Sequence, residues 1–522
     1  MEKNAVVCYH RYIMKIRNQI SEKKEKPKMK KRRILSLILA ALMLSTISCG
    51  EAANPSGGDA SASGETTADN TPVETLRSET KDGLPEKNYN GEEFTILYRD
   101  EWAYEFLAEE ENGDIINDAI LKRNRAVEDR FNIKFNMFGL HGTYDAAEFR
   151  DAVNNSVLAG DSEYDLIAGY QANMITPAME GYFMNIYDMP HIDTKRPWWS
   201  EKCNSSLTVN GKLFMTTGDI ALTLWNNMYV FYFNKKLATD YNIPDMYEIV
   251  KSGDWTIDKL AELSANVSGD VNGDTIYNEN DLYGFITTKQ NHMRAWIVAG
   301  ETPITRQNDE GLMEACFVTE RTQNLLDKLL KLHYTDSTYI GNDALSEPTN
   351  TQEPIIFTSD RALFMSGYLG NSSMLRNMET DFGIIPYPKY DKNQEEYRTT
   401  SHNSVSMMCF PVTVKDPEMS AIITEALCAE AYRNVIPQYY DIALKAKGAR
   451  DDESGEMIDL IRDSLIFDFG WVHSVPMGSI GTIMQELISN NNSGLSSAWA
   501  SKEAKVISGL ETINAAYAKA GE

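Results

Sequence analysis

"GDIINDAILKRNRAVEDRFNIKFNMFG", residues 113–139, decides the fold class because it joins a helix to a strand. Side chains recur at helical spacing from Ile116 to Phe131, and "IKFNMF" then alternates as a strand does. Phe94–Tyr98 form an earlier alternating strand, and "YDLIAG" (Tyr164–Gly169) follows the helical stretch "AAEFRDAVNNSVLAG". Strand, helix, strand, helix and strand within about 80 residues are typical of a parallel α/β sheet.

The middle of the chain predicts further strands, and the end predicts helices. "KLFMTTGDIALTLWNNMYVFYFNKKLA" (212–238) is apolar and β-prone and carries no helical stripe. We also expect strands in "DRALFMSGY" (360–368), "DFGIIPYPKY" (381–390) and "SVSMMCFPVTV" (404–414). From Pro417 onward the pattern is mainly helical. A chain of 522 residues has room for two or three such folded parts.

Charge is unevenly distributed along the chain. Residues 1–48 carry a net charge of +9. Because the whole chain has a net charge of −26, the remaining residues carry −35. An acidic body of this kind repels nucleic acid and anionic lipid, and we exclude both as partners of the folded part.

The positive end has the form of a secretory signal. "MKKRRILSLILAALMLSTISCG" (29–50) places a basic run before fifteen uncharged residues, which is short for a membrane span. Its end resembles a bacterial lipobox, in which Cys49 becomes lipidated, although Thr46 departs from the usual leucine. An ordinary cleaved signal peptide is the alternative. Residues 1–28 are expected to be an upstream extension from a misplaced start codon, 29–48 the signal peptide, and 49–88 a disordered tether.

The cysteines predict no metal or redox chemistry. Besides Cys8 and Cys49 there are four, scattered and without C-x-x-C spacing, and they are expected to be small buried side chains: Cys203, Cys316, Cys409 and Cys428.

"DVNGDTIYNENDLYGF" (270–285) has the spacing of a calcium loop. Thr275 occupies the sharp turn where glycine is usual, and a β-branched residue in a left-handed conformation there costs roughly 1–2 kcal/mol. The loop looks like a dockerin loop, but a dockerin carries two at a chain end. The alternative is a surface turn without metal. The expected calcium ligands are Asp270, Asn272, Asp274, the carbonyl of Ile276, Asn278 and Asp281.

The order of segments resembles the family 1 extracellular solute-binding proteins of bacterial ABC importers, which include maltose-binding protein. The segments that carry the resemblance are "YNGEEFTIL" (89–97), "YDLIAG", "NGKLFMTTGDIAL" (210–222), "YFNKKLATDYNIPDMYEIVKSGDWTIDKL" (232–260) and "LFMSGY" (363–368). The resemblance covers about residues 89–522, and no single motif in it is sharp.

This resemblance implies a two-lobe α/β fold of the periplasmic-binding-protein type II class, with a hinge and C-terminal helices. Lobe 1 would span 89–218 and return over 396–445, lobe 2 would span 219–395 with the calcium-like loop 270–281, and helices over 446–522 would pack on lobe 2 and the hinge. The chain would be a monomer that binds a small solute, expected to be a mono- or oligosaccharide, and passes it to the transmembrane subunits of an ABC permease. It would sit lipid-anchored on the extracellular face of the cell membrane, or in the periplasm of a cell with an outer membrane.

Candidate ligand-binding residues follow from the rule that ligands of α/β sheets bind at the carboxyl ends of strands, and from the need of a sugar for aromatic surfaces and polar groups. At strand ends they are Asp100, Trp102, Tyr170 and Tyr368. At the first crossing that the resemblance implies they are Asp219 and Trp225, and the resemblance adds Trp471, because the family often closes its site with a late aromatic residue. Each has a structural alternative: Trp102 in lobe packing, Trp225 in the hinge core, and Asp100 and Asp219 as helix caps or turn residues.

The competing function is an anchored extracellular glycoside hydrolase or another carbohydrate-active protein. H-E-x-x-H, G-x-S-x-G and P-loop motifs are absent from the sequence, whereas a spatial pair of carboxylates leaves no sequence signature. We therefore expect a binding protein that is not an enzyme and has no required cofactor, with calcium as a structural ion.

Overall fold

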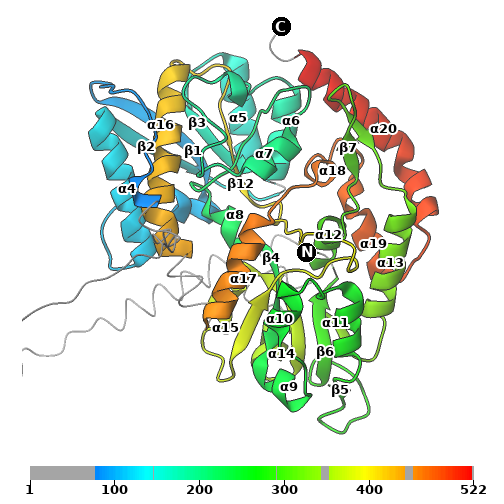
Figure 1. Ribbon diagram of the computed structural model, residues 1–522. Coiled ribbons are helices and arrows are strands. Elements are labelled where there is room, and N and C mark those ends of the chain that lie inside the picture. Colours follow the sequence, from blue (N-terminus) through cyan, green and yellow to red (C-terminus); the bar gives the residue numbers. More distant parts are fainter. Residues whose placement is uncertain (1–76, 145, 290, 342–351, 441–450, 520–522) are drawn as a thin grey trace, which may run out of the picture. The chain divides into compact units, whose positions relative to one another are not determined.

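The computed structural model describes residues 77–144, 146–289, 291–341, 352–440 and 451–519. All of them belong to one compact unit that runs from Thr71 to Glu522. They form two large sheets with helices packed around each, which we call lobe 1 and lobe 2 (Figure 1). Within these ranges no helix has the length and apolar character to cross a bilayer. The expected signal segment, Cys49 and the tether up to residue 76 lie outside the described residues.

Lobe 1 contains a four-stranded sheet in the order β12-β3-β1-β2. The strand β1 pairs in parallel with β2 and β3, while β12 returns late in the chain and pairs antiparallel with β3. Figure 1 shows α4 and α16 on one side of this sheet and α5 and α6 on the other. The bounds are β1 Glu92–Arg99, α4 Ile115–Phe131, β2 Ile133–Leu140, α5 Ala147–Ala159, β3 Leu166–Tyr170, α6 Gln171–Met179, α7 Glu201–Leu207, β12 Ser406–Cys409 and α16 Pro417–Glu430.

The helix–strand junction quoted above forms as its pattern predicts. Asp114 precedes α4 and its carboxylate accepts hydrogen bonds from the backbone N–H groups of Ile116 and Asn117, which caps the helix. Asn132 ends the helix in a left-handed conformation, with φ of 50°, and β2 begins at the next residue. The apolar stripe of α4 is buried at Ile120, Val127 and Phe131 against the sheet and α16.

Lobe 2 contains a six-stranded sheet in which β11, β4, β10, β6 and β5 are successive neighbours and β9 pairs with β6. Every residue of β4 is buried, because helices cover both faces of the sheet. The strand bounds are β4 Tyr229–Asn234, β5 Ser268–Gly269, β6 Leu282–Thr288, β9 Thr338–Gly341, β10 Ala362–Tyr368 and β11 Phe382–Ile385. The other elements are α9 Lys235–Asp240, α10 Met246–Lys251, α11 Ile257–Ser264, α12 Asn291–Ala299, β7 Thr305–Gln307, β8 Met313–Ala315, α13 Glu320–His333, α14 Gln352–Thr358 and α15 Ser372–Leu375.

Two chain segments run side by side from one lobe to the other. We call residues 219–228 the first crossing and residues 397–405 the return crossing. Tyr229 donates its backbone N–H to the carbonyl of Thr400 over 3.0 Å, and His402 donates to the carbonyl of Asn227 over 2.9 Å. A bridge between Met228 and Ser401 lies beside these hydrogen bonds. The crossings therefore form a narrow hydrogen-bonded ribbon between the sheets.

The first crossing holds a short helix, α8 (Leu222–Asn226), where the sequence predicted only β-prone chain. The buried carboxylate of Glu105, in the 3-10 helix η1 (Asp100–Glu105), accepts the backbone N–H of Thr223 at the start of α8. This tertiary contact satisfies a donor that a helix start leaves open. Local sequence patterns do not contain that information, because the partner is over 100 residues away in the chain.

The C-terminal helices contact both lobes. The helix α17 (Asp452–Asp463) packs on β11 and α10, and α19 (Ile483–Ser489) packs on α12 and α13, all in lobe 2. By contrast, α18 (Phe469–Val472) and α20 (Leu495–Lys519) also touch α6 of lobe 1.

Residues 77–88 lie against lobe 1, although the sequence predicted a disordered tether up to residue 88. Asp82 forms ion pairs with Arg130 of α4 at 2.7 Å and with Arg433 at 3.2 Å. Burial alone would raise the pKa of Asp82, but the hydrogen bond and charge of Arg130 and the charge of Arg433 hold that pKa below its usual value. The folded body therefore begins upstream of residue 89.

Candidate functional site

Five aromatic side chains gather where the two lobes meet, and we call them the aromatic cluster: Tyr229, His292, Tyr368, His402 and Trp471. The ring of Tyr229 lies 5.0 Å from that of Tyr368, 6.3 Å from Trp471 and 6.4 Å from His402. The ring of Tyr368 lies 5.1 Å from His292 and 5.7 Å from His402. Tyr368 and His402 are half-buried, while the other three are buried.

The cluster draws on five separate segments of the chain. Tyr229 begins β4 and Tyr368 ends the antiparallel strand β10, so the two are directly opposite in the sheet register. His292 lies in α12, and Trp471 lies in α18. His402 comes from the return crossing. The aromatic cluster therefore lies at one end of the lobe 2 strands β4 and β10, next to the hinge, with Tyr368 and His402 as its partly exposed members.

Both imidazoles of the cluster are neutral at pH 7. Burial lowers the pKa of His292 to about 3. Burial also lowers the pKa of His402 to about 3, assisted by the positive charges of Arg294 and Arg99. A neutral imidazole can both donate and accept a hydrogen bond, which suits a ligand hydroxyl.

Lobe 1 contributes Tyr170 at the carboxyl end of β3. Its hydroxyl donates to the Oδ1 of Asn403 in the return crossing over 2.9 Å. The guanidinium of Arg99 lies 5.2 Å from the centre of its ring, and Tyr144 packs against its edge at 6.1 Å. Burial raises the pKa of Tyr170 to about 12, opposed by Arg99 and Arg294. Tyr170 therefore stays protonated and can serve as a hydroxyl donor.

Arg99 anchors this side of the site to the hinge. Its Nη2 donates to the carbonyl of Ser404 over 2.6 Å and to the hydroxyl of Ser406 over 2.9 Å. The hydroxyl of Ser406 in turn donates to the Oε2 of Glu105 over 2.5 Å. Burial raises the pKa of Glu105, while Ser406, Arg99 and Thr223 oppose the shift. The result is a fully buried polar chain that runs from the sheet of lobe 1 into both crossings.

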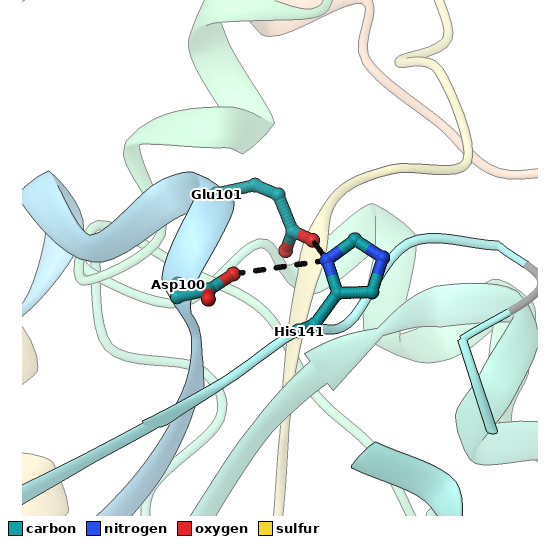
Figure 2. A group of neighbouring side chains, drawn as sticks. All are labelled: Asp100, Glu101 and His141. Carbon is teal, nitrogen blue, oxygen red and sulfur yellow. Dashed lines mark ion pairs between the residues drawn. The ribbon is translucent and has the colours of Figure 1, made fainter. Parts of the chain in front are cut away.

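Asp100, Glu101 and His141 form a second group at the edge of the lobe 1 sheet, where β1 and β2 end (Figure 2). Figure 2 shows both carboxylates pointing toward one imidazole nitrogen of His141. Glu101 forms an ion pair with the Nδ1 of His141, and the Oδ1 of Asp100 lies 3.9 Å from the same nitrogen. Two carboxylates and one imidazole have the donor chemistry of a divalent-cation site, but all three residues are exposed.

The seven predicted ligand-binding residues are in different places. Tyr170, Tyr368 and Trp471 lie in the region where the lobes meet, and Asp100 lies at the exposed edge of lobe 1. Trp102 is half-buried on η1, with its ring 5.8 Å from that of Tyr104. Trp225 is buried in the hinge, with its ring 6.2 Å from that of Tyr440. This is the hinge-packing position given above as the alternative to ligand binding.

Asp219 lies buried in a turn of the first crossing. Burial raises the pKa of its carboxyl to about 8, and the charges of Arg77 and Arg462 only partly oppose that shift. The side chain is therefore largely protonated at pH 7. Its burial within the first crossing makes Asp219 part of the hinge.

Sequence reasoning missed Tyr229, His292, His402 and Asn403. The rule on ligand sites points to the carboxyl ends of strands, whereas Tyr229 begins a strand. Because β4 is antiparallel to β10, its beginning lies at the same edge where β10 ends. The residues in the return crossing could have been found from their polar composition, "SHNS" (401–404), at a predicted crossing.

A separate hollow of about 310 Å³ lies between residues of lobe 1 and the first crossing. Tyr439 donates its hydroxyl to Asn226 at its wall. The lining is mostly apolar and consists of Tyr104, Leu107, Asp114, Ile116, Asn117, Ile120, Asn226 and Tyr439.

The calcium-like loop adopts a tight set of turns. Asp270 accepts hydrogen bonds from the backbone N–H groups of Gly273 and Thr275, and these lower its pKa. Thr275 has φ of 66°, the left-handed conformation expected for its place in the pattern. Asp281 is buried and accepts from the N–H groups of Val271 and Asn278. Among the described residues, the carboxylates of this loop do not gather as closely as those of Asp100 and Glu101 do with His141.

Neither a protein-family model nor a curated protein sequence matches this chain. Solved structures do match. A cyclo/maltodextrin-binding protein complexed with maltotetraose aligns with a TM-score of 0.50 and 11% identity, over 81% of this chain and 97% of that one. A sugar transporter from Rhizobium etli in an open conformation aligns with a TM-score of 0.50 and 13% identity, over 82% of this chain and 99% of that one. These similarities concern the fold, and they confirm the two-lobe α/β class that the resemblance implied.

Proposed function

We propose that this chain is a binding receptor that captures a saccharide between its two lobes and delivers it to an ABC permease. The proposal is supported by the aromatic cluster at the meeting of the lobes, in a fold shared with a maltodextrin-binding protein. The cluster is the observation that carries the proposal, because the C–H faces of a sugar pack on aromatic rings.

Polar groups around the cluster suit the hydroxyls of a sugar. The imidazoles of His292 and His402 are neutral, and the amides of Asn227 and Asn403 lie in or beside the two crossings. Asn227 donates its Nδ2 to the hydroxyl of Ser404 over 2.9 Å, so its position is fixed before any ligand arrives. Groups held in place in this way lose little freedom on binding, which favours affinity.

The two crossings supply a hinge for closure. The hydrogen-bonded ribbon of the two crossings joins the sheets, and a ligand that contacts both lobes stabilises the closed arrangement by the difference in its affinity for the closed and open states. Such a receptor needs no catalytic residue.

The membrane anchor and the partners form a further part of the proposal. Lipidation at Cys49 would hold the monomer at the extracellular face of the membrane, within reach of the permease subunits. In the loop 270–281, a calcium ion would bind the aspartate oxygens that now accept hydrogen bonds from backbone N–H groups. The ion would have a structural role.

Thermal denaturation of the purified protein with neutral and acidic mono- and oligosaccharides tests the proposal, together with chromatography of the sugars afterwards. We expect at least one saccharide to raise the melting temperature and to remain intact. Release of shorter sugars would favour the hydrolase, and a complete panel without any stabilisation would contradict saccharide binding.

A further inference from the structure

The return crossing determines which ring nitrogen of His402 carries the proton. The backbone N–H of Ser404 donates to the Nδ1 of His402 over 3.2 Å, and a backbone N–H can only donate. The Nδ1 atom is therefore an acceptor, and in a neutral imidazole the proton then belongs on Nε2. Burial lowers the pKa of this ring to about 3, so the neutral form is present at pH 7.

A chain of hydrogen bonds across both crossings holds the ring of His402 in place. Asn226 donates its Nδ2 to the Oδ1 of Asn227 over 3.2 Å, and Asn227 donates its Nδ2 to the hydroxyl of Ser404 over 2.9 Å. That hydroxyl lies 2.9 Å from the Nδ1 of His402 and directs its own proton there. The chain therefore ends in the Nε2–H group of His402, which has no hydrogen-bond partner among the described residues.

His292 has the opposite tautomer. Ser366 donates its hydroxyl to the Oγ1 of Thr287 over 2.7 Å, so it has no proton left for His292. The Nδ1 of His292 lies 3.0 Å from the same hydroxyl and must therefore carry the proton and donate. Its Nε2 is left as an acceptor. That atom has no hydrogen-bond partner in the described parts of the chain, yet it is not sealed in the core as the Nε2 of His333 is.

Both imidazoles lie against Tyr368. The ring centre of Tyr368 is 5.1 Å from that of His292 and 5.7 Å from that of His402, with interplanar angles of 77° and 75°. Ser366 and Tyr368 are two residues apart on β10, so their side chains project from the same face of the strand. His292 is hydrogen-bonded to the first and packed against the second, which places its ring over that face with Nε2 directed away from Ser366.

We infer that one saccharide unit packs on Tyr368 and is recognised by two imidazoles of opposite hydrogen-bonding polarity, accepting from the Nε2–H of His402 and donating a hydroxyl proton to the Nε2 of His292. This inference rests on the proposed saccharide receptor and specifies its substrate class: the unit must keep a free hydroxyl where it meets His292. An ether or ester oxygen can accept from His402, but it has no proton for His292. A site that hydrogen-bonds a hydroxyl strongly disfavours an analogue that lacks it.

Side-chain NMR of isotope-labelled histidine in the purified protein, without any sugar, tests the two tautomers. At pH 7 we expect the proton on Nε2 in His402 and on Nδ1 in His292. The reversed assignment for either ring, or a charged imidazolium, would overturn the inference and leave the proposed receptor intact.

Isothermal titration calorimetry tests the recognition itself. The probes are methyl glycosides of mono- and disaccharides built from glucose, galactose, mannose and xylose, each beside its monodeoxy and mono-O-methyl forms. For a parent glycoside that binds wild-type protein, we expect one position at which both derivatives bind about tenfold or more weakly. In His292→Phe this preference should fall to about threefold or less, because the acceptor nitrogen is gone while an aromatic ring remains.

His191→Phe replaces an exposed histidine beside Glu418 of α16 and is the matched control, which should keep the preference. Equal binding of a parent glycoside and all its derivatives by wild-type protein would overturn the inference and leave saccharide binding intact. A panel in which no parent glycoside binds would overturn both. Because the NMR and the wild-type comparison need no variant, the result does not depend on how well His292→Phe folds.

Discussion

Glu105 and Thr223 join lobe 1 to the first crossing by two hydrogen bonds to one carboxylate oxygen. The backbone N–H of Thr223 lies 2.6 Å from the Oε1 of Glu105, and its hydroxyl lies 2.7 Å from the same atom. The other oxygen binds Ser406 next to the return crossing. One buried side chain therefore fixes the spacing of the two strands of the hinge.

Replacing Glu105 by glutamine should destabilise the protein. The amide group of glutamine accepts through one oxygen only, so at least one buried donor loses its partner, and Arg99 loses its balancing charge. We expect a loss of about 1–3 kcal/mol in the free energy of unfolding, measured by urea denaturation. Glu511→Gln, at an exposed position of α20, is the control and should have little effect. A Glu105→Gln protein as stable as wild type would show that the hydrogen bonds of Glu105 to Thr223 and Ser406 are not needed for stability.

Tyr368→Ala should weaken saccharide binding more than it weakens folding. Tyr368 is half-buried and lies at the centre of the aromatic cluster, so a ring that packs on a sugar is lost. We expect about a tenfold loss of affinity by calorimetry, or about 1.4 kcal/mol. Tyr241→Ala removes an exposed tyrosine after α9 and should leave affinity unchanged. If both variants bind like wild type, the cluster is a packing feature only.

Asp219→Asn should reduce the pH dependence of stability. The folded-state pKa of Asp219 is raised to about 8 from an ordinary value of 3.8, so folding takes up a proton between these values. Stability contributed by the protonated carboxyl is fully present at low pH and is lost as pH rises through the folded pKa.

The asparagine variant cannot take up this proton. In urea denaturation from pH 5 to 7, we expect the fall in unfolding free energy to be shallower by about 1.4 kcal/mol per pH unit. Glu425, whose pKa burial raises to about 7, remains in both proteins and keeps part of the slope. Identical slopes would show that Asp219 is ionised in the fold.

Calcium should stabilise the protein through loop 270–281. We expect a higher melting temperature in excess calcium than in excess chelator, because an ion that binds only the folded state shifts the unfolding equilibrium. The double variant Asp270→Asn and Asp274→Asn should abolish the difference. An effect that survives in this variant would place the ion elsewhere, and Asp100, Glu101 and His141 would be the next group to change.

Thr275→Gly should stabilise the folded loop. Thr275 holds φ of 66°, which glycine adopts without strain. The relief of roughly 1–2 kcal/mol exceeds the entropy that glycine loses on folding, so a net gain of about 0.5–1 kcal/mol is expected in urea denaturation. Thr275→Ala keeps a Cβ atom and should gain less. A glycine variant no more stable than the alanine variant would contradict the strain argument.

The sequence predicted the sheets well, because their strands and helices carry local patterns. The stripe of α4 and the alternation of β1 and β2 are properties of short windows, and the structure has both elements in place. The helix α8 was missed because a distant carboxylate, that of Glu105, completes its start.

Prediction of the candidate site from sequence was less complete for a related reason. Tyr368 can be predicted from the rule on strand ends. Tyr229 can be predicted only when β4 is known to run antiparallel to β10. His292 and His402 come from α12 and the return crossing, and they meet at Tyr368 only through tertiary packing. Trp225 and Asp219 were predicted at the first crossing, and both are buried there in the hinge.

The ion pairs of Asp82 have a mechanical consequence. Arg130 and Arg433 belong to α4 and to the segment that follows α16, both in lobe 1. In the proposed receptor, a pull from an anchor upstream of residue 77 would therefore enter the folded body through lobe 1. Closure would then move lobe 2 about the hinge relative to the held lobe 1, so that anchoring would not oppose capture of the ligand.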